Sequence, residues 1–169
     1  MNKKIRTMVI CSLFAALIAV CAWISLPVPP IAVTLQSFAV LLTLGVLGGR
    51  TGFLVVVLYL LMGVIGLPVF SGFRGGAAAL LEPSGGFLWG FLMGAAVYPL
   101  GSRLHKLPAM ILWQLAVYLC GCSWFAVYAG VSPAEAAIAC VIPFLIPDAI
   151  KLWLAYTLSE RIGKQLPMQ

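Results

Sequence analysis

Long apolar stretches alternate along this chain with short segments rich in glycine, proline or charge. A helix needs about 20 apolar residues to cross a bilayer, and on that basis the chain has room for about six spans. The pattern predicts helices over residues 5–26, 33–47, 52–65, 87–104, 109–129 and 147–162. We therefore expect an all-α integral membrane protein with six transmembrane helices, in a single domain over residues 1–169.

A shorter segment, 134–146, precedes the last predicted helix and is too short to span a membrane twice. Ser132 and Glu135 have the spacing of a helix capping box. Interrupted backbone at membrane depth is tolerated only against protein or a water-filled cavity. We therefore expect this segment to form a partial helix or cap in the outer half of the membrane. Pro147 would then open the last helix and place Asp148 in its first turn.

Composition and charge support a membrane protein. Of the 169 residues, 63% are hydrophobic and 8% are charged, and the net charge is +6. The basic residues form short clusters between apolar stretches, so we expect a lipid bilayer and no nucleic acid as partner. With six spans the clusters share one face, which the positive-inside rule assigns to the cytoplasm: Lys3, Lys4, Arg6, Arg50, Arg103, Lys106, Arg161 and Lys164. We expect a cytoplasmic-membrane protein with both termini in the cytoplasm and a first helix that is retained rather than cleaved.

The residues that enzymes and metal sites use are scarce. The only histidine, His105, lies in an inner loop, and H-E-x-x-H and G-x-S-x-G motifs are absent. A G-x-x-x-x-G-K-[ST] motif is also absent, so we do not expect ATP hydrolysis by that route. The five cysteines lie in apolar stretches without a C-x-x-C pair, and we interpret them as buried small hydrophobic residues. We expect no catalytic residue, no metal and no cofactor.

Asp148 and Lys151 stand out because they lie three residues apart in the last apolar stretch and so share a helix face. Charged residues inside a membrane are costly and mark substrate pathways or internal pairs. One interpretation is an ion pair that only neutralises itself. The other is a binding site for a polar group that needs both an acceptor and a donor. A cyclic urea satisfies that requirement, although the residues alone do not select it.

Other polar and small residues allow two interpretations each. Gln36 either bonds a neighbouring helix or bonds a ligand. Arg74, in a glycine-rich outer loop, is either a solvated charge or attracts a ligand carboxylate, to which a guanidinium donates two bonds. Glu82 in the same loop is a solvated charge or a partner for Arg74. Ala15 and Ala19 have the four-residue spacing that lets helices approach closely.

The chain resembles the BioY family, the biotin-specific S components of energy-coupling factor (ECF) transporters. The resemblance covers nearly the whole chain, and its motifs occur in the family's order. They are TLQ (34–36), LGGRTG (47–52), YLLMGVIGLPVF (59–70), PSGG (83–86) and PFLIPDAIK (143–151). The resemblance implies the S-component fold and capture of biotin from outside. It also implies a partnership with a membrane coupling protein and ATPases, or function alone.

The resemblance also implies roles for single residues. Asp148 and Lys151 would hold the ureido ring of biotin, and Arg74, Ser84 and Gln36 complete the predicted ligand-binding set. Ser84 stands where the family has threonine and keeps the hydroxyl group.

The chain differs from the family's sequence pattern at two places, and the resemblance also implies a docking role for two alanines. Glu82 replaces a glycine and adds a charge, and Ile146-Pro147 replaces Pro-Gly before the aspartate. Ala15 and Ala19 correspond to the alanine pair that docks the coupling subunit. Other functions remain open: an S component for another vitamin, a structural membrane protein with an internal ion pair, or an intramembrane enzyme.

Overall fold

The fold is built almost entirely of helices. A computed structural model describes residues 3–102 and 105–164. The α-helices are α1 (Lys3–Trp23), α2 (Gln36–Val64), α3 (Gly85–Ser102), α4 (Lys106–Ala129), α5 (Pro133–Cys140) and α6 (Leu145–Gly163). Two short strands and three 3-10 turns complete the described chain: β1 (Ser25–Leu26), β2 (Val33–Thr34), η1 (Ser71–Phe73), η2 (Ala77–Leu80) and η3 (Ile142–Phe144). Arg103 and the predicted helix end at residue 104 lie outside the described residues.

Four segments of the described chain are long and apolar enough to cross a membrane. They are Lys4–Trp23, Gln36–Val64, Lys106–Ala129 and Pro133–Gly163. The last of them joins α5, η3 and α6, and α3 is not among the four. The described residues therefore confirm several membrane-competent helices, whereas the number six stays a prediction.

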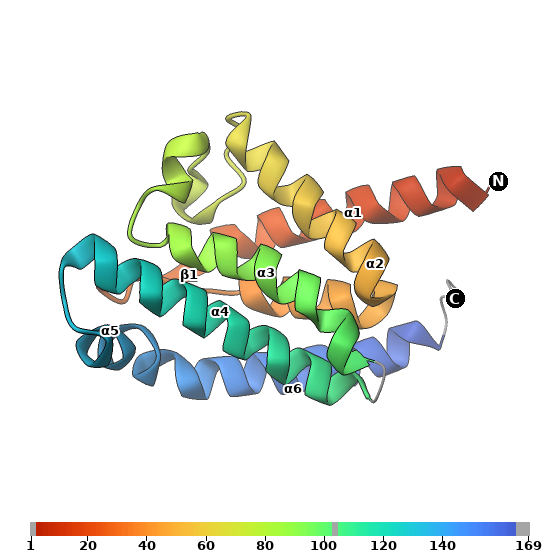
Figure 1. The fold of residues 1–169 in the computed structure, drawn as a ribbon. Helices are drawn as coiled ribbons and strands as arrows, with labels where there is room; N and C mark the ends of the chain where they lie inside the picture. Colours follow the sequence, from red (N-terminus) through yellow and green to blue (C-terminus); the bar gives the residue numbers. More distant parts are fainter. Residues whose placement is uncertain (1–2, 103–104, 165–169) are drawn as a thin grey trace.

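The helices predicted over 33–47 and 52–65 are joined in α2, which is kinked at Gly48. Gly48 has φ +77°, a conformation that residues with a Cβ rarely adopt. The two arms then turn back on each other, as the orange and yellow parts of α2 show in Figure 1. A Cβ on Gly52 would lie 2.8 Å from Cδ2 and 3.0 Å from Cα of Leu44, so the two arms pack closely at this glycine. The predicted turn over residues 48–50 is thus present as a sharp break at Gly48 between two helical arms.

The helix start predicted at residue 33 is wrong, because residues 33 and 34 form β2 instead. Ser25 pairs with Thr34 and Leu26 with Val33 in an antiparallel ladder. β-branched residues such as Val33 and Thr34 suit an extended backbone. The first predicted helix also ends earlier, at Trp23 instead of residue 26. This hairpin sets the start of α2 at Gln36.

The segment before the last helix folds as the sequence predicted, with a partial helix after a capping box. The Ser132 backbone N–H donates to Glu135 Oε2 (2.9 Å), and the Glu135 N–H donates to Ser132 Oγ (3.3 Å). The last helix, α6, begins at Leu145, two residues before the predicted Pro147. A proline in a first helical turn removes no intrahelical hydrogen bond, so the start can shift without penalty. Asp148 lies in the first turn, as expected.

Close packing of α3 against α4 depends on small residues of α3. A Cβ on Gly90 would lie 2.9 Å from the Val117 Cα, and one on Gly94 would lie 2.6 Å from the Trp113 ring. The fully buried Trp113 stacks on Phe91 with ring centroids 5.4 Å apart. Because α3 lies so close, α4 keeps a fixed rotation about its axis.

We predict that Gly90→Ala destabilises the fold, because its Cβ meets backbone rather than a movable side chain. Overpacking of this kind costs about 1–3 kcal/mol. Ala96→Val, at an exposed position of α3, is the matched control and should change stability little. Denaturant unfolding of the detergent-solubilised protein measures both. Equal stability of the two variants would contradict the close approach of α3 and α4.

Candidate functional site

A pocket lies at the end of the helical bundle that carries the β-hairpin and the η1–η2 loop. The space between its walls is about 750 Å³ when the open mouth is included. Its lining contains all five predicted ligand-binding residues: Gln36, Arg74, Ser84, Asp148 and Lys151. Aromatic side chains form much of the apolar wall, namely Phe70, Phe87, Phe91, Tyr118 and Phe144. Side chains far apart in the sequence thus share one cavity.

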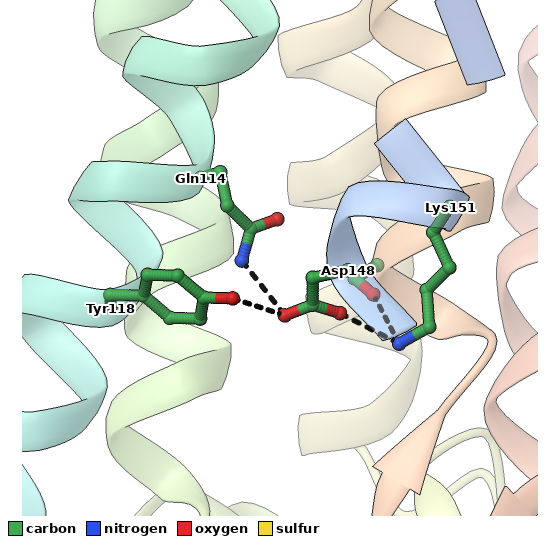
Figure 2. A network of polar contacts seen from close by, with 5 residues as sticks. Gln114, Tyr118, Asp148 and Lys151 are labelled. Atoms are coloured by element: carbon green, nitrogen blue, oxygen red, sulfur yellow. Dashed lines mark hydrogen bonds and ion pairs between the residues drawn. The ribbon is translucent and has the colours of Figure 1, made fainter. Parts of the chain in front are cut away.

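Asp148 stands at the centre of a polar network in this pocket (Figure 2). It lies in the first turn of α6 and is 6% exposed. Its Oδ2 accepts hydrogen bonds from the Tyr118 hydroxyl (2.8 Å) and the Gln114 amide nitrogen (3.1 Å), both on α4. Its Oδ1 accepts from Lys151 Nζ at 2.8 Å. Three donors therefore stabilise the buried carboxylate.

Lys151, one turn further along α6, is 7% exposed and is also held by two elements. Its ammonium group donates to Asp148 and, at 3.2 Å, to Ser37 Oγ at the start of α2. The two opposite charges are mutually neutralising, which a buried ion pair requires. Together the pair offers acceptor and donor atoms to a polar ligand from one helix face.

Gln114 contributes both a bond and an unpaired atom. The donor group of its amide is turned to Asp148, since the opposite orientation would place two acceptor oxygens together. Its Oε1 consequently points away from the carboxylate (Figure 2) and has no hydrogen-bond partner within residues 3–102 and 105–164. A buried acceptor without a partner is energetically unfavourable. Gln114 therefore contributes less net stability to the network than Tyr118 does.

Gln36 both bonds a neighbouring element and lines the pocket. Its amide nitrogen donates to the Tyr59 hydroxyl at 2.7 Å, and that hydroxyl donates to the Val69 carbonyl oxygen at 2.9 Å. This chain of bonds links the two arms of α2 to the segment before η1. Of the two interpretations of Gln36, the structure thus contains the bond to a neighbouring helical arm. The contact of Gln36 with a ligand stays a prediction.

The loop over residues 70–86 forms the rim of the pocket. Arg74 donates through Nε to the Ser71 carbonyl oxygen (2.9 Å), and its Nη1 forms an ion pair with Glu82. The side chains of Arg74 and Glu82 are 47% and 37% exposed, so the pair is accessible to water. Of the two interpretations of Glu82, the structure contains the pairing with Arg74. Ser84, next to α3, also lines the pocket.

Sequence reasoning missed three polar residues of the network. Gln114 and Tyr118 lie four residues apart in an apolar stretch, and that spacing is the signal that would have placed them on one helix face. Ser37 follows Gln36 directly and gave no comparable signal. Two aromatic residues near the outer helix ends do not line the pocket: Tyr59 is fully buried in the core, and Trp89 is 42% exposed.

Ala15 and Ala19, predicted to dock a partner protein, lie in the core of the chain. They are 0% and 5% exposed and belong to the main hydrophobic cluster. Their small side chains serve the internal packing of α1, which explains their spacing equally well. The exposed face of α1 carries other residues, including Leu13, Ala16 and Val20.

Comparison with known proteins places this architecture among transporters. Residues 1–168 match the sequence model of the BioY family. The chain is 36% identical to the probable biotin transporter BioY of Pyrococcus horikoshii, over 94% of this chain and 97% of the relative. It is 39% identical to the biotin transporter BioY of Thermotoga maritima, over 94% of this chain and 96% of the relative. The solved S component for biotin from an ECF-type ABC transporter has the same fold, with TM-score 0.88 and 24% identity over 98% of this chain and 96% of that chain.

We predict that Tyr118→Phe destabilises the ligand-free protein more than Gln114→Leu does. Tyr118→Phe removes a hydrogen bond to a charged group, worth about 1.5–3 kcal/mol. Gln114→Leu removes one bond but also removes the unpaired Oε1, so the two effects partly cancel. Denaturant unfolding in detergent without ligand measures both losses. A larger loss in Gln114→Leu would contradict this account of the network.

Proposed function

The chain belongs to the BioY family, and from this membership we propose that it captures biotin from the outer side of the cytoplasmic membrane and releases it inward. The family consists of transporter subunits rather than enzymes. The observation that carries the proposal is the buried Asp148–Lys151 pair in the lining of a largely apolar pocket. This combination matches a ligand with a polar cyclic urea at one end and an apolar body.

The ureido ring would be held by the charged pair. Its N–H groups need an acceptor, which Asp148 supplies, and its carbonyl oxygen needs a donor, which Lys151 supplies. Because Tyr118 and Ser37 already bond these two side chains, the pair keeps its position before the ligand arrives. Such preorganisation reduces the entropy lost on binding.

The opposite end of biotin, a carboxylate on an aliphatic chain, would lie toward the rim. Arg74 lines the pocket there and is half-exposed, so its guanidinium can pair with a carboxylate. The Ser84 hydroxyl and the Gln36 side chain are the remaining polar groups in our proposed ligand set. Phe87 and Phe91 supply apolar surface for the ring system between the two polar ends.

Six spans would result if both arms of α2 and the shorter α3 each cross the membrane. The chain then reverses direction at every connection, and α1 begins at the same end of the bundle at which α6 ends (Figure 1). Arg50 follows the kink, and Lys106 begins α4. These basic positions favour that end as the cytoplasmic one, with both termini inside. The pocket is then at the outer end.

Energy for uptake would come from a separate ECF module, a membrane coupling protein with its ATPases, or the protein would work alone. Since Ala15 and Ala19 are buried, we expect a coupling protein to use the exposed face of α1 instead, where Ser12 and Ala16 have the same four-residue spacing. Biotin is the transported ligand in this proposal and not a cofactor.

Equilibrium binding of radiolabelled biotin to the detergent-purified protein tests the ligand assignment. Wild type should bind tightly, and Lys151→Ala should lose about 2–5 kcal/mol because it leaves the Asp148 charge buried without its counter-ion. Asp148→Asn should also weaken binding, because it removes the charge that orients Lys151. Lys106→Ala is the matched control, since that lysine pairs with Glu160 at 2.9 Å outside the pocket lining.

Unchanged biotin affinity in a folded Lys151→Ala variant would contradict the proposed site. Unlabelled riboflavin and thiamine should leave the bound biotin in place, whereas displacement by either would favour another vitamin as substrate. If the folded wild type does not bind biotin, the Asp148–Lys151 pair has only a structural role.

Two tryptophan variants distinguish the buried face of α1, which packs in the core, from its exposed face, which we expect to dock a partner. Ala15→Trp should destabilise the protein, because its side chain would enter the core. Ala16→Trp, on the exposed face, should keep biotin affinity but reduce uptake by cells that also carry the energising module. Normal uptake with Ala16→Trp would exclude this part of α1 from docking.

A further inference from the structure

The rim of the pocket contains a carboxylate that already occupies the guanidinium expected to meet the ligand. Glu82 Oε2 pairs with Arg74 Nη1, while Arg74 Nε donates to the Ser71 carbonyl oxygen. Arg74 lines the pocket, whereas Glu82 does not. Glu82 therefore approaches Arg74 from outside the space that a ligand would fill.

The backbone around Glu82 is fixed to the helical bundle. The Trp124 indole N–H on α4 donates to the Glu82 carbonyl oxygen at 2.9 Å, and the Gly85 N–H donates to the same oxygen at 2.8 Å. These bonds hold Glu82 at the start of α3. Its side chain thus remains within reach of Arg74 although both side chains are partly exposed.

We propose that Glu82 is an internal counter-ion that competes with the carboxylate of the ligand for Arg74. This inference rests on the proposed function, because it requires an anionic ligand that meets Arg74. A ligand carboxylate at this guanidinium encounters the negative charge of Glu82 and must share or replace its bond. Glu82 consequently lowers the affinity for anionic ligands and leaves that for neutral ligands of the same shape almost unchanged.

The size of this effect follows from the exposure of the pair. Exposed ion pairs contribute little, so removal of the competing charge should strengthen binding by a factor of about two to five. The competition therefore adjusts affinity without abolishing binding. It also reduces the difference between the affinity of the site for a free acid and its affinity for the corresponding amide.

Binding measurements with biotin and the neutral biotinamide, on the full chain in detergent, test this proposal. Glu82→Gln should bind biotin about two to five times more tightly than wild type does, while its affinity for biotinamide changes less than twofold. In an Arg74→Gln background the same Glu82→Gln change should lose its effect on biotin. Glu135→Gln is the matched control, because it removes the same charge from a residue outside the pocket lining and retains an oxygen for the capping box.

Each outcome decides between distinct explanations. Weaker biotin binding by Glu82→Gln would overturn the proposal and make Glu82 a residue that positions Arg74. Equal gains for biotin and biotinamide, or an equal gain from Glu135→Gln, would also overturn it, because the effect would then be non-specific. If wild type binds biotin and Glu82→Gln does not change its affinity, the competition alone is refuted. If folded wild type binds neither compound, the proposed function itself fails.

Discussion

A carboxylate and an ammonium group are buried together in a largely apolar chain. The arrangement of three helices depends on the hydrogen bonds that these two charged groups require. Asp148 on α6 accepts a further hydrogen bond from Tyr118 on α4, and Lys151 donates one to Ser37 on α2. A buried charge that lacked such partners would destabilise the fold by several kcal/mol. Since the hydrogen-bond partners come from separate helices, the need to bond both buried charges fixes how α2, α4 and α6 surround the pocket. The same atoms supply the acceptor and the donor that we propose hold the ureido ring of the ligand.

Local features of the fold were predictable because short-range physics determines them. Apolar length predicted the helices, and the Ser132–Glu135 spacing predicted a capping box that the structure contains. The three-residue spacing of Asp148 and Lys151 predicted their common face, and they form an ion pair at 2.8 Å. Residue chemistry singled out Arg74 and Gln36 and the family resemblance added Ser84, and all three line the same pocket. Their contacts with a ligand remain proposals.

Features that depend on helix rotation or long-range pairing were not predictable in the same way. Ala15 and Ala19 lie on a helix that is apolar on every side, so its sequence does not show which face is buried. Thr34 was assigned to a helix because its pairing with Ser25 across the hairpin leaves no local signal. Gln114 on α4 meets Asp148 on α6 across 34 residues of sequence, and local sequence does not show that these two helices pack together.

Two contacts join the end of α1 to the rim of the pocket. The Trp23 indole N–H donates to the Pro68 carbonyl oxygen at 2.8 Å, and its ring stacks on Phe73 with centroids 4.9 Å apart. Both contacts join α1 to the loop that carries Arg74. The loop is tied on its other side to α4 through Trp124. The rim of the pocket is therefore held from two sides, by α1 and by α4, which are far apart in the sequence.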